Sequence, residues 1–138
     1  TIGNPYVNPH VNRPFFAGPY ANPEKTVQGV ERIAAITGSL QKKFPQVNMV
    51  LSGTSALREY AAAYGAGMIE DGSCALAGFG RMTFAYPEFV HDLFETGSLR
   101  REKCCAACSK CSAMMRAGKV AGCPVFDKDV YSEIYKSI

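Results

Sequence analysis

The sequence lacks the features of membrane, secreted and nucleic-acid-binding proteins. No apolar run in its 138 residues approaches the roughly 18 residues that a membrane-spanning helix needs. The chain opens with Thr1 and an Asn- and Pro-rich stretch instead of a charged start and an apolar core, so no secretory signal is visible and we expect a processed chain or a fragment. A formal net charge of +3 is too weak to imply a nucleic-acid partner. We therefore expect a soluble, cytoplasmic protein that binds neither membranes nor nucleic acids.

Cysteine is concentrated in one short stretch. Five of the six cysteines fall in residues 104–123, and four of them have two, two and eleven residues between neighbours: Cys105, Cys108, Cys111 and Cys123. Short gaps allow one loop to wrap several thiolates around an inorganic centre, and a distant fourth cysteine closes the shell. The pattern favours an iron–sulfur cluster, [4Fe-4S]. A zinc site and free or redox-active thiols are the alternatives, and Cys104 is an alternative to Cys105 as the first ligand.

The rest of the chain alternates between helical and strand patterns. Four prolines in the first twenty residues exclude a long helix there and predict a loop. Helical spacing of apolar residues, capping residues and glycine stops predict helices over residues 23–43, 55–72, 87–97 and 127–136. Short apolar runs predict buried strands over residues 47–51 and 74–79. We expect Gly80 and Arg81 to open the loop that follows the second strand.

This alternation predicts a parallel α/β fold, because parallel neighbouring strands need a helical crossover between them. A closed (β/α)8 TIM barrel takes about 250 residues, whereas this chain supplies two or three strand–helix units before its cysteines. The chain is therefore either a small open α/β domain or the C-terminal part of a TIM barrel.

The motifs after the two predicted strands resemble those of one family. Ser52-Gly53-Thr54 follows the first strand, and the second strand leads through Gly78-Phe79-Gly80-Arg81 toward Tyr86-Pro87. Together they are similar to the last two strands of the Old Yellow Enzyme family of flavin-dependent oxidoreductases. The cysteine segment resembles that of the iron–sulfur branch, typified by 2,4-dienoyl-CoA reductase and trimethylamine dehydrogenase. The resemblance implies the C-terminal part of an FMN-binding barrel over residues 1–103, then a metal-binding segment and a terminal helix over residues 104–138.

The resemblance also implies where FMN would bind. In TIM barrels a phosphate commonly binds to the loops after strands seven and eight, and glycine lets backbone amides approach an anion closely. The expected contacts of the FMN phosphate are therefore Gly53, Thr54, Gly80 and Arg81, with Arg81 as a forked cationic donor. The alternative is ordinary turn chemistry for the glycines and a surface ion pair for Arg81.

The opening segment would form the loop after the sixth barrel strand, near the flavin ring or the mouth of the substrate site. Its candidate contacts to a small-molecule substrate are Tyr6, Asn8, His10 and Arg13. Bracing of a long loop by side-chain hydrogen bonds is an equal alternative for these residues.

The implied activity is that of an FMN-dependent NAD(P)H:flavin oxidoreductase of the ene-reductase type, in which a nicotinamide reduces FMN and the flavin passes hydride to an activated alkene. The family's catalytic groups lie on earlier strands, so no residue of this chain is assigned as acid, base or nucleophile. No Gly-x-Gly-x-x-Gly motif is present, and two residues instead of the family's three separate Cys108 from Cys111. The competing classes are a non-enzymatic metal module for electron transfer or docking, and a thiol redox sensor.

A barrel segment of two or three strands leaves strand edges and an apolar face uncovered. We therefore expect the chain to pair with the missing N-terminal part of the barrel, to self-associate as a homo-oligomer, and to bind FMN poorly by itself.

Overall fold

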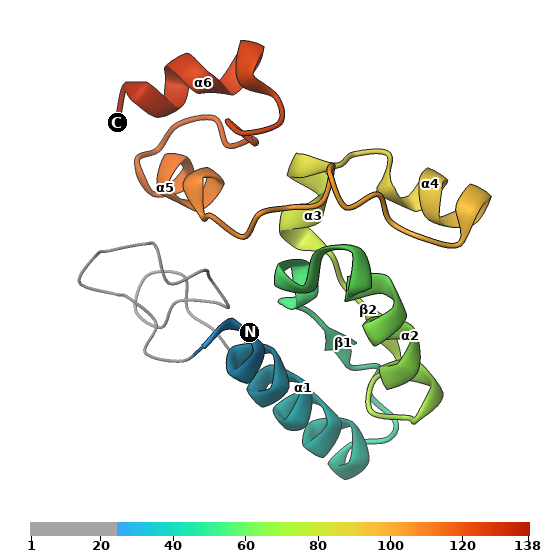
Figure 1. Cartoon of the computed structure of the whole chain (residues 1–138). Helices are drawn as coiled ribbons and strands as arrows, with labels where there is room; N and C mark the ends of the chain where they lie inside the picture. Colours follow the sequence, from blue (N-terminus) through green and yellow to red (C-terminus); the bar gives the residue numbers. More distant parts are fainter. Residues whose placement is uncertain (1–24) are drawn as a thin grey trace.

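The computed structural model describes residues 25–138, so the candidate substrate contacts at positions 6, 8, 10 and 13 lie outside the described residues. The elements, in chain order, are α1 (Thr26–Lys43), β1 (Val50–Leu51), η1 (Thr54–Tyr60), α2 (Ala61–Glu70), β2 (Leu76–Ala77), α3 (Gly80–Ala85), α4 (Phe89–Thr96), α5 (Lys110–Arg116) and α6 (Lys128–Lys136). Figure 1 shows α1 and α2 beside the two strands at one end of the molecule and α5 and α6 at the other. Within residues 25–138, no helix is long and apolar enough to cross a membrane.

Helix α1 forms where the apolar periodicity predicts it. Its buried residues recur at helical spacing and form one face: Gly29, Val30, Ile33, Ala34, Thr37 and Gly38. At its end, the Gln41 side chain donates to the carbonyl of Val47 and accepts from the amide of Met49, both at 3.0 Å. This side chain therefore fixes the turn that leads from α1 into β1.

Strands β1 and β2 are adjacent and parallel, with Val50 opposite Leu76 and Leu51 opposite Ala77. The Leu51 side chain is fully buried, whereas Val50 and Leu76 are each about half exposed on the other face of the pair. Both strands are shorter than the predicted ranges, because only these residues are paired with a neighbouring strand. Parallel pairing agrees with the α/β pattern, and closure into a barrel stays a prediction.

The predicted helix from Ser55 is divided in two. Gly53, with φ 90°, turns the chain into the 3-10 helix η1, and Arg58 interrupts η1 with φ 56° and ψ −122° before α2 begins at Ala61. Helix α2 ends at Glu70, and Gly72, with φ 73°, completes the turn toward β2. The first core lies between α1, η1, α2 and β1. Its buried residues are Val30, Ile33, Ala34, Leu51 and Cys74.

A second core surrounds α3, which begins at Gly80 where a loop was expected. Its buried residues are Met82, Ala85, Tyr86, Phe89, Leu99, Cys104, Cys105 and Cys123. Met82 and Ala85 are the buried side chains of this short helix, and their burial stabilises it. Six residues are too few for apolar periodicity to predict the helix from the sequence. Helix α4 ends at Gly97 with φ 70°, as its sequence predicts.

A polar network braces the chain just before the cysteines. The buried Tyr86 hydroxyl donates to the Asp92 carboxylate, which also pairs with Arg100 Nε at 3.0 Å and Lys103 Nζ at 3.6 Å. The Lys103 ammonium lies 5.0 Å from the centre of the Tyr86 ring. These contacts hold residues 100–103 against α3 and α4, so that the cysteine segment begins from a fixed position.

Candidate metal centre and phosphate-binding turns

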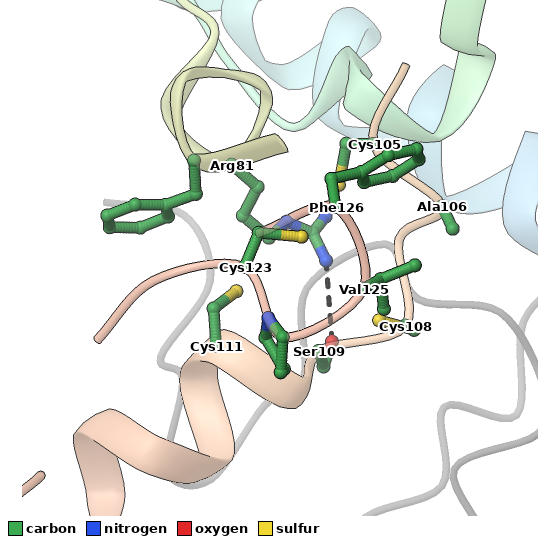
Figure 2. Close-up of a pocket in the computed structure, with 11 residues that line it drawn as sticks. Arg81, Cys105, Ala106, Cys108, Ser109, Cys111, Cys123, Val125 and Phe126 are labelled. Atoms are coloured by element: carbon green, nitrogen blue, oxygen red, sulfur yellow. Dashed lines mark hydrogen bonds between the residues drawn. The ribbon is translucent and has the colours of Figure 1, made fainter. Parts of the chain in front are cut away.

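One small pocket is lined by all four cysteines of the spaced motif, Cys105, Cys108, Cys111 and Cys123. Its remaining walls are Arg81, Phe84, Ala106, Ser109 and the residues after the last cysteine, Pro124, Val125 and Phe126. Figure 2 shows these side chains coming from α3, the loop before α5, α5 itself and the loop before α6. The cavity is ≈ 10 Å³, close to the volume that about one water-sized sphere occupies. The fold thus brings the four thiols to a common space.

Cys105 is held by hydrogen bonds at both its backbone amide and its sulfur. Its backbone amide donates to Met82 Sδ at 3.4 Å, and its Sγ accepts the amide of Ala107 at 3.3 Å. A backbone N–H aimed at sulfur favours the charged thiolate, the form that binds metals. Burial, the largest effect, raises the pKa of the Cys105 thiol, whereas the Ala107 amide and the Arg81 guanidinium act in the opposite direction.

The loop that carries the first two cysteines has an unusual backbone. Ala107 has φ 52° and Ser109 has φ 60°, both in the left-handed region that favours glycine. Non-glycine residues in this region cluster at functional sites, where the surrounding structure holds them. Ser109 lies between Cys108 and Cys111, and no sequence signal distinguishes it from an ordinary spacer residue.

Cys104, the alternative first ligand, belongs to the core and not to the pocket lining. It is fully buried, and its Sγ donates to the carbonyl of Arg100 at 3.2 Å. Burial, followed by the nearby Glu59 carboxylate, raises the pKa of the Cys104 thiol. Cys74 is buried in the first core, so neither of these cysteines faces the other four.

Arg81 lines the cysteine pocket. Figure 2 shows its guanidinium reaching between the cysteine side chains, and Nη1 lies 3.4 Å from Ser109 Oγ. Burial raises the pKa of the Cys111 thiol, and the Arg81 charge opposes this rise, as it does at Cys105. A permanently charged guanidinium here lowers the cost of gathering several thiolates in one cavity.

The four thiols line the same cavity, but their sulfur atoms do not converge on a single metal position. Within residues 25–138, no three His, Cys, Asp or Glu side chains converge tightly enough to hold one metal ion. All six cysteines lie in this described part of the chain, and each is a free thiol there. Binding a metal centre in the pocket would therefore require cysteine side chains to rotate toward it.

The two turns proposed for a phosphate lie at the same edge of the strand pair. Gly53 and Gly80 follow β1 and β2, and these strands are parallel neighbours, so both turns leave the carboxyl edge. Thr54 is 1% exposed, and its Oγ1 has no hydrogen-bond partner among residues 25–138. A buried hydroxyl without a partner is costly and fits a polar ligand at this edge. The guanidinium of Arg81, the fourth predicted contact, lies in the cysteine pocket, where its Nη1 is 3.4 Å from Ser109 Oγ.

Comparison of the chain with protein-family models, with curated proteins and with solved structures found no match. The Old Yellow Enzyme resemblance therefore stays a prediction.

Proposed function

We propose that this chain is the C-terminal portion of an FMN-dependent NAD(P)H:flavin oxidoreductase, and that it supplies a thiolate-bound iron–sulfur centre and the phosphate end of the flavin site. The observation that carries the proposal is the single pocket lined by Cys105, Cys108, Cys111 and Cys123, next to the turn that follows β2. Thiolates are the ligands that iron–sulfur clusters require.

The donor set of the pocket supports an iron–sulfur centre. Four cysteine sulfurs supply a complete set of ligands, the Ala107 amide donates to Cys105 Sγ, and Arg81 adds a positive charge near Cys105 and Cys111. Amide–sulfur hydrogen bonds and nearby charge are the features by which proteins tune such centres. Zinc remains the alternative metal, because four thiolates also suit tetrahedral zinc.

The edge beyond β1 and β2 supports the flavin part of the proposal. Gly53 and Gly80 would bring backbone amides to the phosphate, Thr54 would offer its unpartnered hydroxyl, and Arg81 would offer its guanidinium. Bound FMN would supply hydride transfer from a nicotinamide to an activated alkene. The residues of this chain would hold the phosphate, and the groups that bind the substrate carbonyl and donate a proton would lie on earlier strands outside it.

The first test is the metal content and visible spectrum of the purified chain after anaerobic incubation with iron and sulfide. We expect brown protein with iron and sulfide bound, because iron–sulfur centres absorb visible light and zinc or free-thiol forms do not. Colourless protein that binds zinc in their place would overturn the iron–sulfur assignment.

The flavin part needs a separate measurement, since the chain lacks most of a barrel. We expect the complete gene product to bind FMN and an Arg81→Gln variant of it to bind FMN less tightly. The matched control is Lys42→Gln, which removes one positive charge from an exposed position near the end of α1. Equal FMN affinity in the Arg81 variant and the parent would remove Arg81 from the phosphate site.

The alternative function is a metal module for electron transfer or partner docking without flavin. It is supported by the second core, in which Cys104, Cys105 and Cys123 pack with Met82 and Tyr86. Residues 81–126 supply all the walls of the pocket. A complete gene product that binds iron and sulfide but no FMN would favour this alternative.

A further inference from the structure

Helix α6 carries two tyrosines at the spacing that puts them on one face. Tyr131 and Tyr135 are four residues apart, and both are half-buried although no residue of α6 is fully buried. Helices α5 and α6 are in contact. Both rings contact the cysteine segment.

Tyr131 packs on Gly122, the residue before Cys123. A Cβ atom built at position 122 would overlap three carbons of the Tyr131 ring, Cζ, Cε1 and Cε2, far inside normal contact. Gly122 is buried, and its φ does not lie in the left-handed region, so its role here is to make room for the ring and not to allow a special turn. The ring and the chain just before Cys123 are therefore pressed face to face.

Tyr135 makes the second contact, to the residue before Cys111. The Lys110 ammonium lies 5.1 Å from the centre of the Tyr135 ring, within the range of a cation–π contact. Lys110 is the first residue of α5, and Cys111 follows it. The two tyrosines thus contact the immediate neighbours of two different pocket cysteines.

We propose that α6 is a clamp in which Tyr131 and Tyr135 are positioning residues for Cys123 and Cys111. Cys105 and Cys123 both pack in the second core, and the Ala107 amide also holds Cys105, whereas Cys111 lies outside that core. Cys111 and Cys123 come from segments separated by the loop of residues 117–122. A helix that touches both segments fixes the distance between the two sulfurs. Residues that contact metal ligands without binding the metal themselves orient those ligands and affect how tightly the metal is bound.

The clamp predicts a non-additive pair of substitutions. Gly122→Ala places a methyl group where the Tyr131 ring lies and displaces it, whereas Tyr131→Ala removes the ring. In the double variant the methyl group has nothing to overlap, so we expect it to behave like Tyr131→Ala alone and not like the sum of the two. Tyr131→Phe keeps the ring and should behave like the parent. Val130→Ala, on an exposed position of the same helix, is the matched control.

The first readout is independent of metal: the alkylation rates of Cys111 and Cys123 by iodoacetamide in the metal-free full chain, measured peptide by peptide. We expect Gly122→Ala and Tyr131→Ala to accelerate Cys123 selectively and Tyr135→Leu to accelerate Cys111. Cys74, buried in the first core, reports global unfolding. Parent rates in all three variants, equal acceleration of Cys74, or additive effects in the double variant would overturn the clamp.

The second readout, release of bound iron or zinc to a chelator, depends on the proposed function. We expect release to be about 10-fold faster in Gly122→Ala and Tyr131→Ala, as for other losses behind metal ligands. A parent chain that binds no metal but has the expected alkylation pattern would overturn the metal centre and support the clamp. A parent chain that binds metal, with variants that release it at the parent rate, would overturn the clamp alone.

Discussion

Two regions of the chain are held together by different interactions. The strand region, residues 26–77, is held by a continuous apolar core in which α1 and α2 cover the buried side of β1. The cysteine segment, residues 104–138, has short helices, left-handed residues at Ala107 and Ser109, and a few specific contacts between its turns. The stability of the first region depends on how much apolar surface is buried. The thiol geometry of the second depends on the positions of a few contacting atoms. Substitutions should therefore affect stability in one region and thiol geometry in the other.

The largest effect on stability should come from the strand region. Leu51→Ala removes a fully buried side chain at the centre of the first core and should lower the free energy of unfolding by about 2 to 5 kcal/mol. Leu76→Ala, on the exposed face of the neighbouring strand, should change it by no more than about 0.5 kcal/mol. Urea denaturation followed by circular dichroism measures both. Similar losses in the two variants would mean that the exposed face is covered in solution.

The sharpest functional contrast should come from two adjacent cysteines. Cys105 lines the pocket and Cys104 belongs to the core, and both are buried. We expect Cys105→Ala to lower bound iron and sulfide to background and Cys104→Ala to retain them with some loss of thermal stability. Metal analysis of the two variants decides the point. Loss of metal only in Cys104→Ala would transfer the ligand role to Cys104.

The polar network between the two regions should make stability depend on pH. The Tyr86 hydroxyl, and then Arg100 and Lys103, hold the pKa of the Asp92 carboxyl below its usual range against the opposing effect of burial. Because the folded pKa is depressed, this stabilisation is present above the unfolded pKa and is lost as the pH falls through the folded pKa. We expect the melting temperature to fall on acidification, and to fall less in Asp92→Asn. Parallel pH profiles of the two proteins would contradict this.

The smallest effect should come from the backbone of the cysteine loop. Ala107 has φ 52°, a conformation that costs a non-glycine residue about 1 kcal/mol. Ala107→Gly should therefore leave stability unchanged or raise it by less than about 1 kcal/mol, since glycine offsets part of the gain through its own entropy. Ala113→Gly, inside α5, should have the opposite sign and cost about 1 kcal/mol. Denaturation midpoints of the two variants test the contrast, and equal losses would mean that Ala107 is not strained.

Much of the secondary structure follows from the periodicity of the sequence. The helix over residues 26–43, the parallel strand pair, the helix that stops at Gly97 and the terminal helix from Lys128 all lie within the ranges that apolar spacing and capping predict. The two short helices α3 and α5 were not predicted. Each spans about two turns, and such short helices are stabilised by tertiary packing more than by their own residues.

The spacing of the cysteines by itself predicts that the thiols of this segment gather at one site, because two-residue gaps bring side chains of one loop to the same side, but it leaves Cys104 and Cys105 as alternatives. Only the tertiary structure decides the rest of the site. It separates Cys104 from Cys105, brings Arg81 to the thiols from 24 positions before Cys105, and packs Tyr131 on Gly122. Two of these features are contacts between residues that are distant in the chain, and the third is the different direction of two adjacent side chains. Local sequence patterns carry no information about either.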